Sequence, residues 1–408
     1  MNTFTYMYKE IFIMFVLICS LTKGYAQTDT TKFFQRIPAD TSKEKMNMDA
    51  VYNRPFLTPG KLPIAIGGYL EANLQYAQTD GISEGFTFQA RRFTLFFSST
   101  IAKKIKFLSE LEFEGGTREI NIEFAAVDII FHPLINLRGG IIMNPIGAFN
   151  QNHDGPRWDF IDRPISATSI IPTTLSSAGF GLHGKYIVNN WIVGYEAYLT
   201  NGFDDNIISN EKGRTSLAAG KKDPERFEKN NSGLPMFTGK IAIRNRKIGE
   251  LGFSYMTGVY NEWKADGLIL DEKRSSSVLA VDFTSSLLND RLNFTGEVAK
   301  VFVDVPGTYS QQYGTQQFGG YLDIVGTVMK RKVLGWENAK LNLGLRLEYA
   351  DYNQGKFNET GDDIGDEIWA IVSSIAFRPV GSTVLRFNYR YHQETDLLRN
   401  PPVLTGVF

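Results

Sequence analysis

The chain has 408 residues, of which 43% are hydrophobic and 13% aromatic, and its formal net charge at pH 7 is −1. This near-neutral balance gives no basis for a nucleic-acid partner, which would require a basic surface. The single cysteine, Cys19, lies in the first 26 residues, so the remainder cannot be stabilised by disulfides. Beyond those residues no apolar run approaches the length of a membrane-spanning helix, which excludes a helical membrane protein.

Residues 1–26 predict a signal peptide. Lys9 precedes an apolar stretch, Ile11 to Leu21, and Gly24-Tyr25-Ala26 forms a small-x-small cleavage site. Residues 27–61 are polar and show no periodicity. We interpret them as an extended periplasmic N-terminal segment, with a short plug as the alternative. The third predicted domain, residues 62–408, is the barrel described next.

From residue 63 onward, apolar and polar residues alternate with the period of two that is typical of β-strands. In the clearest run, 341–349, Leu341 and Leu345 share one face while Arg346 and Glu348 share the other. Sixteen runs of this kind are predicted as strands, at 63–77, 85–99, 103–115, 118–132, 134–143, 178–190, 191–203, 236–246, 248–262, 275–287, 290–304, 315–331, 338–352, 366–378, 381–394 and 403–408.

The gaps between these runs alternate between long and short, as in bacterial outer-membrane barrels with short periplasmic turns. The sequence therefore predicts an all-β fold, an antiparallel 16-stranded transmembrane β-barrel with a long third external loop at 144–177. The fourth loop, 204–235, is expected to project outward. A charge on the lipid face costs about 2–4 kcal/mol at mid-bilayer, so polar residues in the other register predict a hydrated interior.

The third loop is the best candidate for a pore constriction. In large porins a loop folds inward and its charged side chains set selectivity. We expect residues 144–177 to do the same, with an outward loop of solvated charges as the alternative. The candidate residues of this loop are Arg157, Arg163, Asp154, Asp159 and Asp162.

Charged residues in the inward register of the wall form the second group of candidates. The bases could form an anion track, or they could pair with carboxylates on neighbouring strands. The bases are Arg92, Arg138, Lys185, Lys240, Arg244, Arg346, Arg386 and Arg390, and the acids are Glu110, Glu112 and Glu114. The three acids share one face about 7 Å apart. We interpret them as a stripe paired with arginines rather than as a divalent-cation site.

In the second run the apolar residues lie at even positions before Arg91-Arg92, as in Phe86 and Phe88, and at odd positions after it, as in Phe93 and Leu95. This change predicts a β-bulge or an interface position for one of the two arginines. The chain has four histidines and no GxSxG, HExxH or P-loop pattern. We therefore predict a protein that is not an enzyme, with no catalytic residue, no cofactor and no resident metal. The acidic stretches 204–206 and 361–366 are interpreted as ordinary loop tips rather than Ca²⁺ sites.

Several motifs, taken in order, resemble the phosphate-selective porin O and P family. They are Phe88–Phe93 with its Arg-Arg pair, the strand and Pro-x-Gly turn at 137–147, the loop and strand re-entry at 160–164 and 177–181, and the strand end at 199–202. The resemblance covers most of residues 63–394. It implies a sixteen-stranded outer-membrane porin, commonly a trimer, whose phosphate selectivity rests on an arginine and lysine ladder. The mixed acids and bases of the inferred lumen depart from that ladder.

We therefore predict a porin of a Gram-negative outer membrane that passes small hydrophilic solutes. The alternatives are a phosphate-selective anion channel of the same fold and, from another class, a barrel-type outer-membrane enzyme or ligand receptor. The expected partners are outer-membrane lipid and lipopolysaccharide, the solutes or anions that pass, and further copies of the chain. The barrel-assembly machinery is expected to recognise the terminal Phe408. The last run, 403–408, is shorter than the roughly 9–11 residues of a usual crossing.

Overall fold

The computed structural model describes residues 45–52, 54, 64–102, 104–116, 118–223, 225–308, 314–357 and 360–408. The predicted signal peptide and most of the segment 27–61 lie outside the described residues. Met46–Phe408 forms one compact unit, and all the contacts given below lie within it. No helix in the described ranges has the length and apolar character needed to cross a bilayer.

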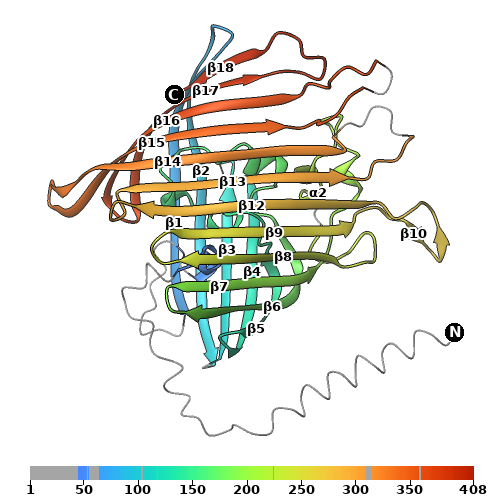
Figure 1. Ribbon diagram of the computed structural model, residues 1–408, viewed down its shortest axis with the longest axis horizontal. Coiled ribbons are helices and arrows are strands. Elements are labelled where there is room, and N and C mark those ends of the chain that lie inside the picture. The colour runs from blue at the N-terminus through green and yellow to red at the C-terminus, as the bar shows by residue number, and fades with distance from the viewer. Residues whose placement is uncertain are drawn as a thin grey trace, which may run out of the picture. The chain divides into compact units, whose positions relative to one another are not determined.

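Sixteen antiparallel strands form a closed barrel (Figure 1). They are β1 (Ile64–Thr79), β2 (Ile82–Ala102), β3 (Ile105–Glu114), β4 (Glu119–His132), β5 (Ile135–Met143), β6 (Ser176–Val188), β7 (Trp191–Thr200), β8 (Met236–Asn245), β9 (Gly249–Val259), β12 (Ser275–Leu287), β13 (Leu292–Val303), β14 (Gln316–Val333), β15 (Trp336–Asp351), β16 (Glu367–Val380), β17 (Thr383–Glu394) and β18 (Val403–Val407). Each predicted run coincides with one of them, so the predicted antiparallel 16-stranded barrel is confirmed.

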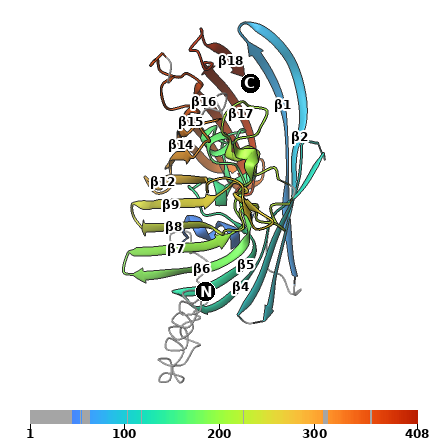
Figure 2. The same cartoon turned by 90° about the vertical axis from the view of Figure 1, so that its right-hand side faces the viewer.

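Strands that follow one another along the barrel sequence are paired, and β18 closes the ring by pairing with β1. The hairpin of β1 and β2 extends beyond β3, and Figure 2 shows it in blue. The remaining elements are short: η1 (Asn47–Tyr52), η2 (Asn150–Asn152), η3 (Gly155–Arg157), η4 (Ser166–Ile170), η5 (Asp205–Ile207), α2 (Leu217–Gly220), β10 (Lys264–Ala265) and β11 (Leu268–Ile269).

The two faces of β15 follow the predicted register. Leu345 is 39% exposed on the outer face, whereas its neighbour Arg346 is 1% exposed and points inward. Leu343 and Leu347 are also exposed, and Glu348 is buried. Successive side chains of a strand point to opposite faces, so this pattern gives an apolar exterior suited to lipid and a polar interior.

A β-bulge lies at the predicted position. Glu71 of β1 pairs with Arg92, but the next residue, Ala72, pairs with Ala90, so Arg91 is the extra residue. Both arginines reach inward, where Arg91 contacts Asp162 and Arg92 contacts Glu71. A bulge allows two consecutive side chains to share a face, and the parity change in the sequence is the sign of it.

The hydrated interior predicted from the inward register is wrong for one part of the barrel. Ile170 from the segment between β5 and β6, and Ile207 and Leu217 from the segment between β7 and β8, pack against Val278 and Val301 of the wall. All five are almost fully buried. The loops carry apolar side chains inward, so the inward valines of β12 and β13 face protein instead of water. Strand periodicity does not record where a distant loop will pack.

We expect that an arginine on the outer face of the barrel wall will lower stability, and that an arginine on the inner face at the same height will not. Leu345→Arg should reduce the free energy of unfolding in lipid vesicles by about 2–4 kcal/mol, because the charge enters hydrocarbon. The matched variant is Thr295→Arg, which lines an interior cavity. It lies at nearly the same height, because Thr295 pairs with Asp323 and Asp323 pairs with Arg346. Equal losses in urea titrations of the two variants would show that the faces are assigned wrongly.

Candidate functional site

The segment 144–175, between β5 and β6, lies inside the barrel and contacts opposite parts of its wall. The backbone amides of Ala148 and Phe149 donate to one carboxylate oxygen of Glu297 on β13, at 2.7 and 3.0 Å. Farther along the segment, Asp162 pairs with Arg91 on β2, which lies nearly opposite β13 in the ring of strands. The segment therefore crosses the interior, as an inward-folding third loop would.

Two residues near its start fix how the segment enters. The side-chain amide of Asn150 donates to the carbonyls of Asn144 and Leu175, and its oxygen accepts from the amide of Leu175, so it joins the two ends of the segment. Gly147 has φ +65°, and a Cβ there would lie 2.2 Å from the Glu297 carboxylate. Only glycine tolerates that backbone at so close an approach.

Each predicted candidate of the segment forms an ion pair. Asp159 pairs with Arg378 of β16 (2.7 Å) and Asp162 with Arg91 of β2 (2.8 Å). Arg163 lies 3.5 Å from Glu112 and 3.6 Å from Glu114. Arg157 lies 3.2 Å from Asp154 within the segment. The charges of the segment are thus matched largely by charges of the wall.

The candidate bases of the wall are also paired. The pairs are Arg92 with Glu71 and Glu114, Arg138 with Asp128, Lys185 with Asp49, Lys240 with Asp282, Arg244 with Glu250, Arg346 with Asp323, Arg386 with Glu71, and Arg390 with Glu348. This geometry favours cross-strand pairing over an unneutralised anion track. Arg346 is in addition covered by the ring of Phe160, 4.3 Å from its guanidinium carbon.

Six of the candidate bases fall into two groups. Arg92, Arg163 and Arg386 gather with Glu71, Glu112 and Glu114 on the β1–β3 side. Lys185, Lys240 and Arg244 belong to the other group, near η1. The backbone amide of Asn47 donates to Glu250, the partner of Arg244, and its side chain donates to Asp282, the partner of Lys240.

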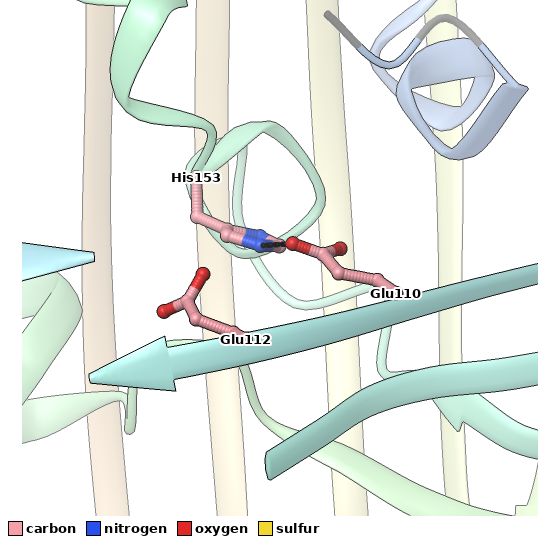
Figure 3. Close-up of side chains that lie close together, drawn as sticks. All are labelled: Glu110, Glu112 and His153. Carbon is pink, nitrogen blue, oxygen red and sulfur yellow. Dashed lines mark hydrogen bonds and ion pairs between the residues drawn. The ribbon is translucent and has the colours of Figure 1, made fainter. Parts of the chain in front are cut away.

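Glu110, Glu112 and His153 form a buried cluster between β3 and the inserted segment (Figure 3). The His153 Nε2 atom lies 3.2 Å from Glu110, and Nδ1 lies 2.7 Å from the carbonyl of Asn150. These two contacts fix the orientation of the imidazole ring between β3 and the segment. These three side chains could together hold a metal ion, as could Glu112, Glu114 and Glu123.

Arginines already neutralise this cluster. The Arg54 guanidinium lies 3.1 Å from Glu110 and 3.0 Å from Asp154, and it lies over the ring of Phe124. Burial disfavours the charged form of Asp154, but the nearby Arg54 and Arg157 outweigh burial and hold its pKa below the usual range. A divalent cation would have to compete with fixed guanidinium groups. The stripe of acids therefore fits the arginine-paired interpretation better than a cation site.

Residues 46–52 and 54 agree with the short plug, the alternative interpretation of residues 27–61, although the sequence identified none of their contacts. Tyr52 contacts Asp128 and accepts a hydrogen bond from Arg138, while Asp49 pairs with Lys185. Met46 and Met48 pack on Ile192 and Ala242 of the inner wall. The segment lacks periodicity, and its only sequence signal is a set of charged, aromatic and methionine residues in a stretch that is otherwise polar. These contacts place it within the barrel interior.

The expectation that the fourth loop projects outward is wrong for part of it. The ammonium of Lys221 donates to the carbonyl of Thr173 at 2.6 Å, so the loop packs onto the inserted segment. Arg214 pairs with Asp366 just before β16. Apolar residues around α2 draw this loop over the apolar cluster described above. Lys229, by contrast, remains exposed on the same loop.

A cavity of about 580 Å³ lies at the end of the barrel that carries the short turns. Residues 156–160 of the inserted segment form one side of its lining. The parts of β12 to β16 nearest the short turns form the other side. Turn residues 381–382 lie at its rim, and Asn47 of η1 contributes to the lining.

Comparisons with known proteins agree with the fold. No protein-family model matches the chain. An uncharacterised protein of Aquifex aeolicus (strain VF5) is 32% identical over 215 residues, which are 50% of this chain and 46% of the relative. The chain thus spans about half the length of the curated relative that it matches. The resemblance to the O and P family remains a prediction.

Several solved structures have a similar fold. They include the channel DcaP of Acinetobacter baumannii (12% identity, TM-score 0.50, 86% of this chain and 98% of that one). For the anion-selective porin of Comamonas acidovorans the identity is 11% and the TM-score 0.50, and the match covers 84% of this chain and 97% of that one. For Salmonella typhi OmpF, in complex with daunomycin, the identity is 10% and the TM-score 0.50, and the match covers 85% of this chain and 98% of that one. At these identities the likeness shows the fold alone, a porin-like β-barrel.

We expect Arg54 to be essential to the stability of the interior. Arg54→Ala would leave Glu110 and Asp154 buried without their shared counter-charge and should cost about 3–5 kcal/mol of unfolding free energy. The matched control is Lys229→Ala, which removes the exposed pair with Glu225 and should leave the free energy of unfolding nearly unchanged. Urea unfolding in detergent micelles measures both. Similar small losses in the two variants would mean that Arg54 is not held as the structure places it.

Proposed function

We propose that this protein is an outer-membrane porin through which small hydrophilic solutes diffuse passively. The observation that carries the proposal is the inserted segment 144–175, which spans a closed, lipid-compatible barrel and meets its wall at Glu297, Arg378 and Arg91. A segment in that place narrows the path and brings charges close to every passing solute. The predicted signal peptide and the porin-like fold support a location in a Gram-negative outer membrane.

Selectivity in this proposal is weak rather than phosphate-specific. A ladder selects anions when its cations are not neutralised, because they then replace the hydration an anion loses. Here Arg92, Arg346 and Arg390 each face a carboxylate within ion-pair distance. A phosphate-selective channel of the same fold remains the alternative, and it rests on the family resemblance.

A closed receptor of the same fold is the second candidate function, and one observation favours it. Residues 46–52 and 54 occupy part of the interior and are tied to the wall through Arg54, Tyr52 and Asp49. A segment so held would obstruct passage if it remained in place. A barrel-type enzyme lacks comparable support.

The proposed partners follow from the outer surface and from the family resemblance. The exposed leucines and aromatic residues of the outer face would contact lipid and lipopolysaccharide. We include a homotrimer in the proposal because the resembling family is commonly trimeric. The ring of Phe408 packs on Tyr389 beside β18, the strand that closes the barrel. The barrel-assembly machinery is the proposed partner that recognises Phe408.

Removing two bases from the inserted segment should make the pore more cation-selective. Arg157→Ala with Arg163→Ala would leave Asp154, Glu112 and Glu114 less neutralised where the path is narrowest. The zero-current potential in a KCl gradient across a planar bilayer should shift toward the cation value.

The control for this prediction replaces Lys229 and Lys356, whose ammonium groups are exposed on outer loops. At physiological salt the Debye length is about 8 Å, so these charges should hardly affect permeation. An equal shift in both double variants, or none in either, would place the inserted segment outside the permeation path.

Replacing Asn47–Tyr52 by a Gly-Ser stretch of the same length should raise single-channel conductance, because the replacement removes contacts that hold η1 in the interior. The porin proposal expects the unaltered protein to conduct and the variant to conduct more. A silent parent with a conducting variant would instead support the closed receptor. Identical conductance in both would show that η1 does not limit the path.

A further inference from the structure

The cavity at the short-turn end has a lining that is polar but largely uncharged. Its neutral hydrogen-bonding side chains include Asn152, Asn293, Thr295, Thr327, Asn338 and Asn342. They come from the inserted segment and from three consecutive strands, so they converge on one space from several directions. Its volume of about 580 Å³ falls within the roughly 300–1,000 Å³ range of small-molecule sites.

The charges of the lining cancel. Three acids, Asp159, Asp290 and Asp323, are balanced by three bases, Arg157, Lys340 and Arg378. Most of these are already paired: Asp159 with Arg378, Asp323 with Arg346, and Arg157 with Asp154. The cavity therefore offers no unbalanced charge that would select an anion or a cation.

Hydrogen-bonding capacity remains available within it. The side chains of Thr295 and Asn338 make no hydrogen bond with any other residue in the part of the chain that the structure describes. Thr327 and Asn342 are bonded to each other, and the Asn342 amide donates to Asp159 at 3.2 Å. These bonds hold the amide and carboxylate in fixed positions, so little side-chain freedom is lost when a ligand binds.

An aromatic ring completes the lining. The indole N–H of Trp158 donates to the carbonyl of Asn152 at 2.6 Å, and Phe149 lies against the ring with centroids 4.7 Å apart. Both contacts fix the orientation of Trp158, which lines the cavity. A fixed aromatic surface beside amides and hydroxyls suits a ligand with apolar C–H faces and many hydroxyl groups.

We propose that this cavity binds a neutral polyhydroxylated solute, a sugar of one to three rings. The ligand rests a C–H face on Trp158, and its hydroxyls bond to Thr295, Asn338 and the Asp159–Asn342 pair. The inference rests on the proposed channel function and deepens it by naming a solute class. The cavity is then a resting site at one end of the path, on the short-turn side of the inserted segment.

Maltotriose titrated into KCl solution on both sides of a bilayer tests the inference, with the mature protein reconstituted as a channel. Conductance should fall with sugar concentration and saturate. Thr295→Val and Asn338→Ala each remove one hydrogen-bonding group and should raise the half-saturating concentration about three- to tenfold. Trp158→Ala should raise it at least as much. Asn73→Ala, an interior asparagine outside the cavity lining, is the matched control and should leave it unchanged.

The outcomes separate the inference from the function it rests on. A channel that conducts KCl but shows only a linear, non-saturating decline with sugar overturns the sugar site and leaves the porin intact. Saturating inhibition by sodium phosphate, with none by maltotriose, overturns the ligand class. If the protein does not conduct, the porin proposal fails, and calorimetric titration of maltotriose into detergent-solubilised protein still decides the site. Equal effects in the Asn73 and Asn338 variants also contradict it.

Discussion

The interior of this barrel depends on the pairing of charges that have been taken out of water. An isolated guanidinium or carboxylate is too costly to bury, but a matched pair with further hydrogen bonds is tolerated. Arg346 with Asp323 and Arg138 with Asp128 satisfy this requirement along the wall. Arg54 satisfies it between the wall and the inserted segment. The two inserted segments can therefore occupy a space lined by charge.

This dependence is mutual. The wall fixes the segment 144–175 through Arg378, Glu297 and Arg91, and the segment in turn supplies counter-charges to that wall. Where apolar side chains are brought in instead, around Ile170 and Leu217, the inward face of the neighbouring strands is apolar as well. The chemistry of each wall sector thus matches the chemistry of the chain that packs on it, and the charge left to act on a solute is small.

The sequence predicted the parts of this structure that follow from local periodicity. Alternation defined the strands and the faces of Leu345 and Arg346, and a change of parity located the bulge at Arg91. The cover that Phe160 provides over Arg346 could not be predicted, because it joins residues far apart in the chain and leaves no periodic signal. The contacts of residues 46–52 and 54 could not be predicted for the same reason. Their partners lie on strands whose spatial arrangement the sequence does not state.

The bulge at Arg91 also bears on how such a strand can change in evolution. On one side of it the outward positions of β2 are Phe86 and Phe88, and on the other they are Phe93 and Leu95. The apolar positions of the two halves are out of phase by one residue, and the bulge absorbs that residue so that both halves keep their apolar faces toward lipid. Removal of Arg91 would restore unbroken alternation, with Ala90 still outward and Arg92 still inward, whereas removal of one residue elsewhere in β2 would exchange the two faces on one side of the deletion. Single-residue deletions should therefore be tolerated at the bulge or at the turn beyond Thr79, and should be rare at other positions of this strand among related chains.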